Sequence, residues 1–227
     1  MLLTLENVLS KSECKTIVKQ LEEADWVQGA ATAGHIAKNV KQNLQLAQDN
    51  TLGLKLGELL VEKLAQRGDF QSAAVPHKIF PPMFNCYQGG GTFGDHIDNA
   101  IRFHPTNGIA IRTDLSITVF LNEPDEYQGG ELIIQDTYAE QKIKLAAGSA
   151  ILYPSTSVHQ VTPVTEGRRL ASFFWLQSFI PDLVQRGTLY QLDQSIQALT
   201  ASVPEHPEII RLSGIYHNLL RQWSVSV

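Results

Sequence analysis

The stretch Tyr87-Gln88-Gly89-Gly90-Gly91-Thr92-Phe93-Gly94-Asp95-His96-Ile97-Asp98 decides the fold expected for this chain. Three glycines mark a turn, and the residues after them predict a β-strand over 92–97. Successive side chains of a strand point to opposite faces, so His96 and Asp98 emerge on the same face. An imidazole and a carboxylate on one face can hold a metal ion jointly.

Two later residues complete a candidate site. His159 follows Asp98 after 61 residues, and Arg169 follows ten residues later. Two histidines and one carboxylate are typical of Fe(II) oxygenases, whereas structural zinc sites use four protein ligands and often thiolates. Arg169 could grip a small dicarboxylate whose other end chelates the iron. The alternative is a surface histidine beside a solvated acid, because His-x-Asp pairs also arise by chance.

Alternating hydrophobicity covers the middle of the chain. From residue 74 to 177 the period is two, and turn signals recur every ~8–12 residues, as in a sandwich or barrel. The segment 99–112 reads as a loop. We expect an α+β fold with a mainly β core, a double-stranded β-helix (jelly roll) whose strands lie at 83–87, 92–97, 114–121, 131–134, 142–145, 150–153, 157–161 and 168–176.

Helical segments flank this core. Ser10-Lys11-Ser12-Glu13 reads as a capping box that opens a helix to about Ala24. A second helix should run over 52–65 and end at Arg67-Gly68. The residues between these helices, 29–50, read mostly as loop. From Pro181 onward helical spacing returns and predicts two more helices.

These periodicities divide the chain into an N-terminal helical support (1–73), a jelly-roll core (74–180) and a C-terminal helical extension (181–227). The extension carries more apolar surface than two short helices can bury against each other. We therefore expect it to cover the barrel or a second subunit, and we favour a homodimer.

Composition narrows the class of protein. The 227 residues are 43% hydrophobic and 18% charged, which is ordinary for a globular protein. A net charge of -5 offers no positive field for nucleic acid or for an anionic membrane. The N-terminus lacks a basic targeting region, no apolar run could span a bilayer, and Cys14 and Cys86 make no disulfide framework. We expect a cytoplasmic protein without nucleic-acid or membrane partners.

At a finer level the chain resembles a known family. The opening stretch, together with Leu121-Asn122, Gly129-Gly130-Glu131-Leu132, His159-Gln160-Val161-Thr162-Pro163-Val164 and Gly167-Arg168-Arg169, resembles the prolyl-4-hydroxylase-type domain of Fe(II)/2-oxoglutarate dioxygenases. Leu152-Tyr153-Pro154-Ser155 and Phe174-Trp175-Leu176-Gln177-Ser178, before a helical extension, are similar to bacterial PKHD-type hydroxylases. This resemblance covers essentially the whole chain.

The resemblance implies roles for the four residues singled out above. His96, Asp98 and His159 would be the catalytic metal ligands. Arg169 would bind the C5 carboxylate of 2-oxoglutarate. The reading from the residues alone agrees on all four.

Other contacts to the co-substrate are less direct. Tyr87 matches a position from which a tyrosine hydroxyl reaches 2-oxoglutarate in related enzymes, although a core aromatic is the alternative. Period two from Arg169 places Ala171, Phe173 and Trp175 on the inward face, where Trp175 could wall the co-substrate or simply pack in the core. Some relatives carry a second tyrosine where this chain has Phe120. Thr118, on the same face as Phe120, is a candidate to supplement Arg169.

The activity implied by the resemblance is a 2-oxoglutarate-dependent hydroxylase (dioxygenase). O2 and the 2-oxo acid would react at Fe(II), yield succinate and CO2, and hydroxylate a small-molecule or peptidyl substrate. The family also implies L-ascorbate as a reductant and suggests a link to bacterial iron uptake. Two alternatives stay open: a non-catalytic jelly-roll sensor of iron or 2-oxoglutarate, and a cupin-like or carbohydrate-binding module with incidental metal residues.

Several basic residues could shape the entrance of the site. Arg102, Arg112 and Arg168 could give it a positive rim for an anionic or catecholate-like substrate, or could be ordinary surface charges. His104, in the expected loop 99–112, could line the entrance or be solvated. The remaining histidines, which lack metal-ligand spacing, are expected to be structural: His35, His77, His206 and His217.

Overall fold

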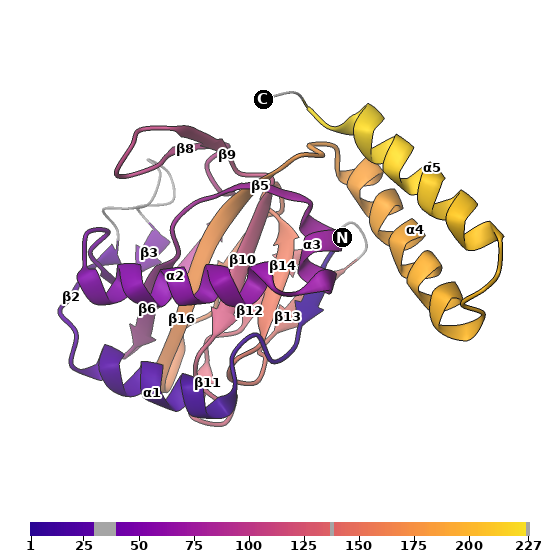
Figure 1. Ribbon diagram of the computed structural model, residues 1–227. Helices are drawn as coiled ribbons and strands as arrows, with labels where there is room; N and C mark the ends of the chain where they lie inside the picture. The colour runs from indigo at the N-terminus through magenta and orange to yellow at the C-terminus, as the bar shows by residue number, and fades with distance from the viewer. Residues whose placement is uncertain (30–39, 137–138, 226–227) are drawn as a thin grey trace.

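Two antiparallel sheets form the core of the protein in a computed structural model that describes residues 1–29, 40–136 and 139–225 (Figure 1). The larger sheet has the strand order β1 (Leu3–Leu5), β14 (Ala150–Pro154), β10 (Leu115–Phe120), β16 (Val164–Ser178), β6 (Met83–Gln88), β4 (Leu44–Leu46) and β2 (Trp26–Gln28). Two further strands, β5 (Pro76–Ile79) and β11 (Tyr127–Gly129), also pair with β16.

The smaller sheet lies on the other side of the core. Its order is β13 (Glu140–Ile143), β12 (Leu132–Gln135), β15 (His159–Val161), β7 (Thr92–His96) and β3 (Lys41–Gln42). A separate hairpin joins β8 (Ile101–Phe103) to β9 (Ala110–Arg112). One pocket is lined from both sheets, so the two sheets enclose it as in a jelly roll. The predicted α+β fold with a mainly β core is confirmed.

The register of two strand pairs positions the site. In the larger sheet β16 places Arg169 opposite Tyr87 of β6 and Phe173 opposite Thr118 of β10. In the smaller sheet β15 places His159 opposite His96 of β7. Residues far apart in the chain therefore meet through backbone pairing.

Three helices cover the outer face of the larger sheet (Figure 1). They are α1 (Lys11–Glu22), α2 (Thr51–Ala65) and α3 (Gly68–Ala74). Ser10 caps α1, and the predicted capping box with Glu13 is present. The buried apolar residues of these helices pack with β10, β14 and β16 in the main hydrophobic cluster, so the helices support the sheet that carries Arg169.

The C-terminal segment forms a helical hairpin of α4 (Leu183–Ser202) and α5 (Glu208–Trp223). It extends from one end of the domain, and α4 packs against α3, where the Ser72 hydroxyl donates a 2.6 Å hydrogen bond to Asp193 (Figure 1). Only Arg186 and Leu189 of α4 are buried, and no residue of α5 is. The hairpin does not lie over the barrel, so of the two predicted alternatives only the cover of a second subunit remains, and it stays a prediction.

All eight predicted strands are present, with ends shifted by a few residues, and so are the four predicted helices. One loop prediction is wrong, because residues 99–112 contain the β8–β9 hairpin. The segment 29–50, read mostly as loop, contains the short strands β3 and β4, and α2 ends at Ala65, before Arg67-Gly68, where α3 begins. The rest of that predicted loop, 30–39, lies outside the described residues.

The missed strands are two to four residues long, too short for a period-two pattern to appear. They form because longer strands offer them partners. The N-terminal segment 1–73 therefore adds strands to both sheets besides its helices. Among the described residues no helix has the length and apolar character needed to cross a membrane.

Candidate metal centre

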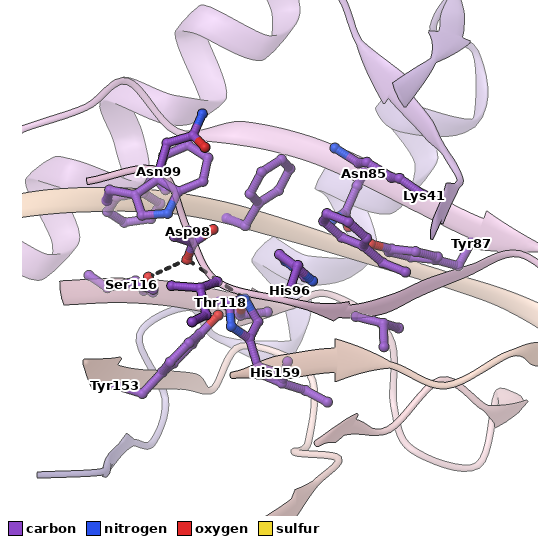
Figure 2. A pocket seen from close by; sticks show the side chains of 18 of the residues that line it. Lys41, Asn85, Tyr87, His96, Asp98, Asn99, Ser116, Thr118, Tyr153 and His159 are labelled. Atoms are coloured by element: carbon purple, nitrogen blue, oxygen red, sulfur yellow. Dashed lines mark hydrogen bonds and ion pairs between the residues drawn. The ribbon is translucent and has the colours of Figure 1, made fainter. Parts of the chain in front are cut away.

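His96, Asp98 and His159 converge at one side of the pocket (Figure 2). One potential ligand atom from each lies within 4.8 Å of the others. Nε2 of His159 lies 3.7 Å from Oδ2 of Asp98, and the two imidazole centroids are 4.2 Å apart. Asp98 follows the last residue of β7, just beyond the strand, and still reaches the histidines. The structure brings together the three residues that the sequence singled out.

Neighbouring polar groups orient each of these side chains. Nδ1 of His96 lies 2.8 Å from the carbonyl oxygen of Gly94, and Nδ1 of His159 lies 3.0 Å from that of Ser157. A proton on Nδ1 can donate to these carbonyls, which leaves Nε2 of each ring for a metal.

A serine pair holds the carboxylate. The Ser116 hydroxyl donates a 2.7 Å hydrogen bond to Oδ2 of Asp98, and Ser116 and Ser155 hydroxyls lie 2.7 Å apart. Figure 2 shows Ser116 reaching Asp98 from the strand below it. Local sequence did not predict this role for either serine, although Ser155 belongs to the Leu152-Tyr153-Pro154-Ser155 motif, because the two contacts join residues 18 and 39 positions apart.

The imidazole of His96 is in the neutral protonation state that binds metal ions. Burial, followed by repulsion from His159, lowers the pKa of His96 to about 4. Phe93 stacks on the ring with centroids 3.5 Å apart. His96 is therefore neutral near pH 7, the protonation state in which imidazole binds metal ions. Two imidazoles and a carboxylate suit Fe(II).

Arg169 projects into the same pocket from the larger sheet. It is 1% exposed, and its three guanidinium nitrogens have no hydrogen-bond partner of good geometry among the described residues. The guanidinium lies 5.4 Å from the ring of Tyr87 and 5.1 Å from that of Phe120. A buried cation without hydrogen bonds is costly, so the site fits an anionic ligand such as the carboxylate of 2-oxoglutarate.

The backbone of Gly130 makes room for Arg169. A Cβ atom at Gly130 would lie 2.9 Å from Cδ of Arg169 and 2.8 Å from a methyl group of Val164. Gly130 also has a φ of +68°, which L side chains rarely adopt. The Gly129-Gly130 motif therefore both allows the turn and leaves space for the Arg169 side chain.

Three hydroxyl side chains line the pocket together with the metal ligands and Arg169. Thr118 and Tyr153 are buried and line the pocket, and Tyr87 lines it as well. Burial raises the pKa of Tyr87 to about 12 and that of Tyr153 well above its ordinary value. Both phenols are protonated near pH 7 and can donate a hydrogen bond to a carboxylate. The sequence predicts Tyr87 and Thr118 as co-substrate contacts but does not single out Tyr153, although Tyr153 lies in the Leu152-Tyr153-Pro154-Ser155 motif.

Aromatic side chains form a further wall. Phe173 and Trp175 line the pocket with their rings edge to face, 5.6 Å between centroids. Ala171 is buried but is not among the lining residues. Trp175 also packs edge to face on Phe80, at 5.5 Å. Trp175 therefore packs in the core and also lines the pocket.

The basic residues expected at the rim separate into different environments. Arg102 lines the pocket. Arg112 instead pairs with Asp114 at 2.6 Å, and Arg168 extends away from the pocket to lie 3.9 Å from Sγ of Cys86. His104 is half-buried, its Nδ1 accepts a 3.2 Å hydrogen bond from the backbone N–H of Thr106, and it is not a lining residue of the pocket.

Lys41 is a lining residue that sequence reasoning missed, because its short strand had been read as loop. It is 6% exposed, and its Nζ donates a 2.8 Å hydrogen bond to Oε1 of Gln45. Nζ lies 5.0 Å from the ring centroid of Phe93 and 5.5 Å from that of Phe173. Burial lowers the pKa of Lys41 to about 7.

Comparisons with known proteins agree with this geometry. The 2OG-Fe(II) oxygenase superfamily matches residues 82–177, which include all four predicted site residues, and the PKHD-type hydroxylase C-terminal domain matches 184–224. A PKHD-type hydroxylase of Saccharophagus degradans is 55% identical over 224 residues, covering 99% of each chain. The chain belongs to the PKHD-type hydroxylase family.

Two solved structures share the fold at low identity. A prolyl hydroxylase of Trichoplax adhaerens, in complex with a hypoxia-inducible factor peptide, has a TM-score of 0.55 at 17% identity, covering 77% of this chain and 82% of its own. A viral collagen prolyl hydroxylase of Paramecium bursaria Chlorella virus-1, in a 2OG complex, has a TM-score of 0.51 at 16% identity, covering 78% and 96%.

Membership in the PKHD-type family makes this protein a 2-oxoglutarate-dependent hydroxylase, an oxidoreductase that uses O2. The family implies Fe(II) and 2-oxoglutarate, and the pocket has a donor set for the first and a buried arginine for the second.

Proposed function

We propose that this protein hydroxylates a small-molecule or peptidyl substrate and couples that reaction to the oxidative decarboxylation of 2-oxoglutarate to succinate and CO2. The observation that supports it is the meeting of His96, Asp98 and His159 with the buried guanidinium of Arg169 in one pocket. A metal donor set or an arginine alone would not favour this chemistry over simple ligand binding.

His96, Asp98 and His159 are proposed to hold Fe(II), which supplies the activation of O2 when bound. The hydrogen bonds of Gly94, Ser157 and Ser116 keep the three donors oriented, as partners of metal ligands generally do. Three protein donors leave coordination positions of iron for the co-substrate and for O2.

Arg169 is proposed to bind the C5 carboxylate of 2-oxoglutarate through its planar fork. Thr118, Tyr87 and Tyr153 are the hydroxyl groups that line the pocket with it. They replace the second tyrosine that some relatives carry, since Phe120 offers the guanidinium only its ring face.

The aromatic residues of the pocket are proposed to exclude water from the reacting groups. Phe93 stacks on His96, and Phe173 and Trp175 line the same pocket. Trp175 thereby bounds the space for the co-substrate. A dry site strengthens the ionic contacts within it and protects reactive species from hydrolysis.

Turnover under defined conditions tests this proposal. Purified protein with Fe(II), 2-oxoglutarate and O2 should form succinate, and mass spectrometry of candidate substrates should find one that gains a single oxygen atom. A non-catalytic sensor would bind iron and 2-oxoglutarate without forming succinate. A carbohydrate-binding module would bind its ligand without iron or 2-oxoglutarate.

Four finer expectations remain predictions: stimulation by L-ascorbate, a link to iron uptake, a cytoplasmic location and a homodimer. Ascorbate dependence is measured directly, as succinate formed with and without the reductant. The division at residues 73/74 and 180/181 also stays a prediction.

A further inference from the structure

Arg102 is the one arginine of the β8–β9 hairpin that faces the pocket. It pairs across the hairpin with Ile111, which is buried beside Phe80 and Trp175. Its guanidinium carbon lies 3.6 Å from the ring centroid of Trp175 and 5.6 Å from that of Phe80. The flanking Ile101 and Phe103 are exposed. The alternation of the strand therefore directs Arg102 inward.

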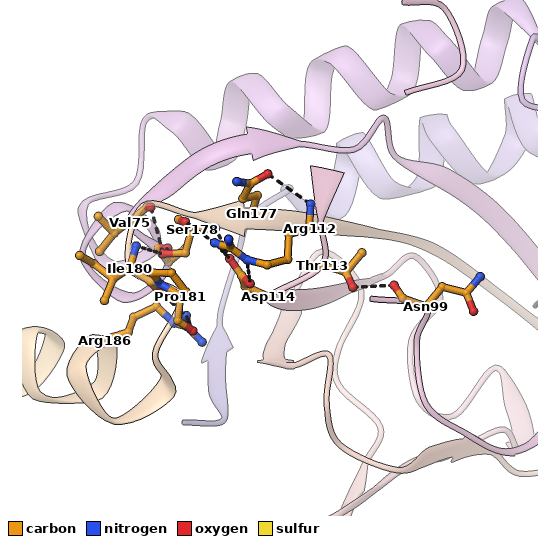
Figure 3. A network of polar contacts seen from close by, with 11 residues as sticks. Val75, Asn99, Arg112, Thr113, Asp114, Gln177, Ser178, Ile180, Pro181 and Arg186 are labelled. Carbon is orange, nitrogen blue, oxygen red and sulfur yellow. Dashed lines mark hydrogen bonds and ion pairs between the residues drawn. The ribbon is translucent and has the colours of Figure 1, made fainter. Parts of the chain in front are cut away.

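The hairpin is fastened at its base, so Arg102 is held in place. The Thr113 hydroxyl donates a 2.6 Å hydrogen bond to the carbonyl of Asn99, and Asp114 accepts from Arg112 and from the backbone of Ser178 (Figure 3). The first contact joins the two ends of the hairpin to each other, and the second joins its C-terminal end to the end of β16. A fixed arginine loses little freedom on binding a ligand.

Arg102 forms no ion pair with an acidic side chain among the described residues. Its Nε is buried without a hydrogen-bond partner in the described parts of the chain, and burial lowers its pKa. Asp98 is the only acidic lining residue that the structure describes. The segments outside the description, 30–39, 137–138 and 226–227, contain no Asp or Glu side chain. The rings of Trp175 and Phe80 contact the guanidinium, the attraction of Asp98 only partly opposes the effect of burial on the Arg102 pKa, and a guanidinium stays protonated even there.

The positive charge of Arg102 is not needed to neutralise the bound co-substrate. Ferrous iron and Arg169 carry three positive charges together, and Asp98 with the two carboxylates of 2-oxoglutarate carry three negative ones. The loaded site is thus balanced without Arg102, which lines the same pocket. Lys41, also a lining residue, brings a second basic group into the pocket, and its nearness to Arg102 adds to the effect of burial that lowers the pKa of Lys41 to about 7. An anion bound beside Lys41 would favour its charged form.

We propose that Arg102 determines substrate specificity by binding an oxyanion, a carboxylate or phosphate group, on the primary substrate, with Lys41 as the second cation of the pocket. This proposal rests on the proposed function, since it names the class of substrate for the same site. The substrate body would lie along the apolar wall of Phe93, Ile97 and Trp175.

Direct binding tests the proposal without turnover. Anaerobic protein saturated with Fe(II) and 2-oxoglutarate, which occupies Arg169, is titrated calorimetrically with benzoate and with neutral benzamide. Benzoate should bind about tenfold more tightly, the difference expected for one charge-assisted hydrogen-bond pair. Arg102→Met, which keeps an apolar stem over Trp175, should abolish that preference. Arg102→Lys should keep part of it.

Arg221→Gln is the matched control, since it removes one positive charge from the exposed surface of α5. It should keep the benzoate preference of the unchanged protein. Phenyl phosphate separates the two sources of an oxyanion: tighter binding than benzoate, lost in Arg102→Met, would support the site and assign it to phosphate. Equal binding of benzoate and benzamide, or a preference that persists in folded Arg102→Met, would overturn the proposal.

Different results would contradict the hydroxylase function and the proposed role of Arg102. Succinate formation by the unchanged protein and by Arg221→Gln, together with no preference for an anion, would leave the hydroxylase function standing and remove the role of Arg102. If neither the unchanged protein nor Arg221→Gln formed succinate but both preferred the anion, the role of Arg102 would stand and the hydroxylase function would be removed.

Discussion

The hydroxyl of Ser116 donates to Oδ2 of Asp98 at 2.7 Å, the same oxygen that lies 3.7 Å from Nε2 of His159. Ser116 thereby fixes which way the carboxylate faces in the metal centre. Ser155, whose hydroxyl lies 2.7 Å from that of Ser116, extends the contact inward.

Ser116→Ala should weaken Fe(II) affinity by about 10–100-fold, because groups that orient metal ligands contribute on that scale. Competition with a chromophoric chelator measures it. Ser155→Ala should have a smaller effect, since Ser155 acts through Ser116. Ser195→Ala, on α4, is the control. Unchanged affinity in Ser116→Ala would show that Asp98 is oriented by other means.

His96→Ala, Asp98→Ala and His159→Ala should each abolish Fe(II) binding and turnover while the fold stays intact, because the site holds a catalytic rather than a structural ion. Anaerobic Fe(II) with 2-oxoglutarate should give the unchanged protein a weak visible charge-transfer band that these variants lack. His104→Ala, at a half-buried residue outside the pocket, should keep the band. Full activity in any of the three would remove that residue from the ligand set.

Arg169→Lys should raise the 2-oxoglutarate concentration needed for half-maximal succinate formation by about tenfold or more, because a point charge cannot replace the bidentate fork. Arg168→Lys should change it little, since Arg168 lies outside the pocket. Steady-state assays at varied 2-oxoglutarate compare the two. A larger effect at Arg168 would mean that the inward register of β16 is wrong.

Gly130→Ala should raise the same 2-oxoglutarate requirement, because the new methyl group would push on the Arg169 side chain. Its positive φ should also cost about 1–2 kcal/mol of stability. Gly187→Ala is the matched control, since a Cβ there meets nothing within 4 Å and alanine favours the helix. Thermal unfolding and kinetics, measured together, separate the two effects. Normal kinetics in Gly130→Ala would show that Arg169 can shift freely.

Deletion of residues 182–227 should destabilise or aggregate the protein, because it uncovers the face of α3 at Ser72 and removes buried Leu189. Sedimentation of the full chain tests the predicted homodimer. If α5 forms the contact, Ile210→Lys, at an 80% exposed residue, should yield monomers, while Gln222→Lys should not. A soluble, monomeric and fully active truncation would leave the dimer without support.

Local patterns in the sequence predicted much of this protein. Period two located the eight main strands, and the capping box at Ser10 located the start of α1, because both signals lie within a few residues of the element they describe. Spacing likewise selected His96, Asp98, His159 and Arg169, since the chemistry restricts which residue types can serve.

The tertiary structure alone decided the surroundings of that site. Ser116, Tyr153 and Lys41 enter the pocket from strands whose partners are distant in the chain, so no local spacing marks them. Local spacing likewise does not distinguish the three arginines that were expected at the rim, Arg102, Arg112 and Arg168. Only the packed fold buries Arg102 over Trp175 while it pairs Arg112 with Asp114, because burial and charge pairing depend on contacts between strands that meet only after folding.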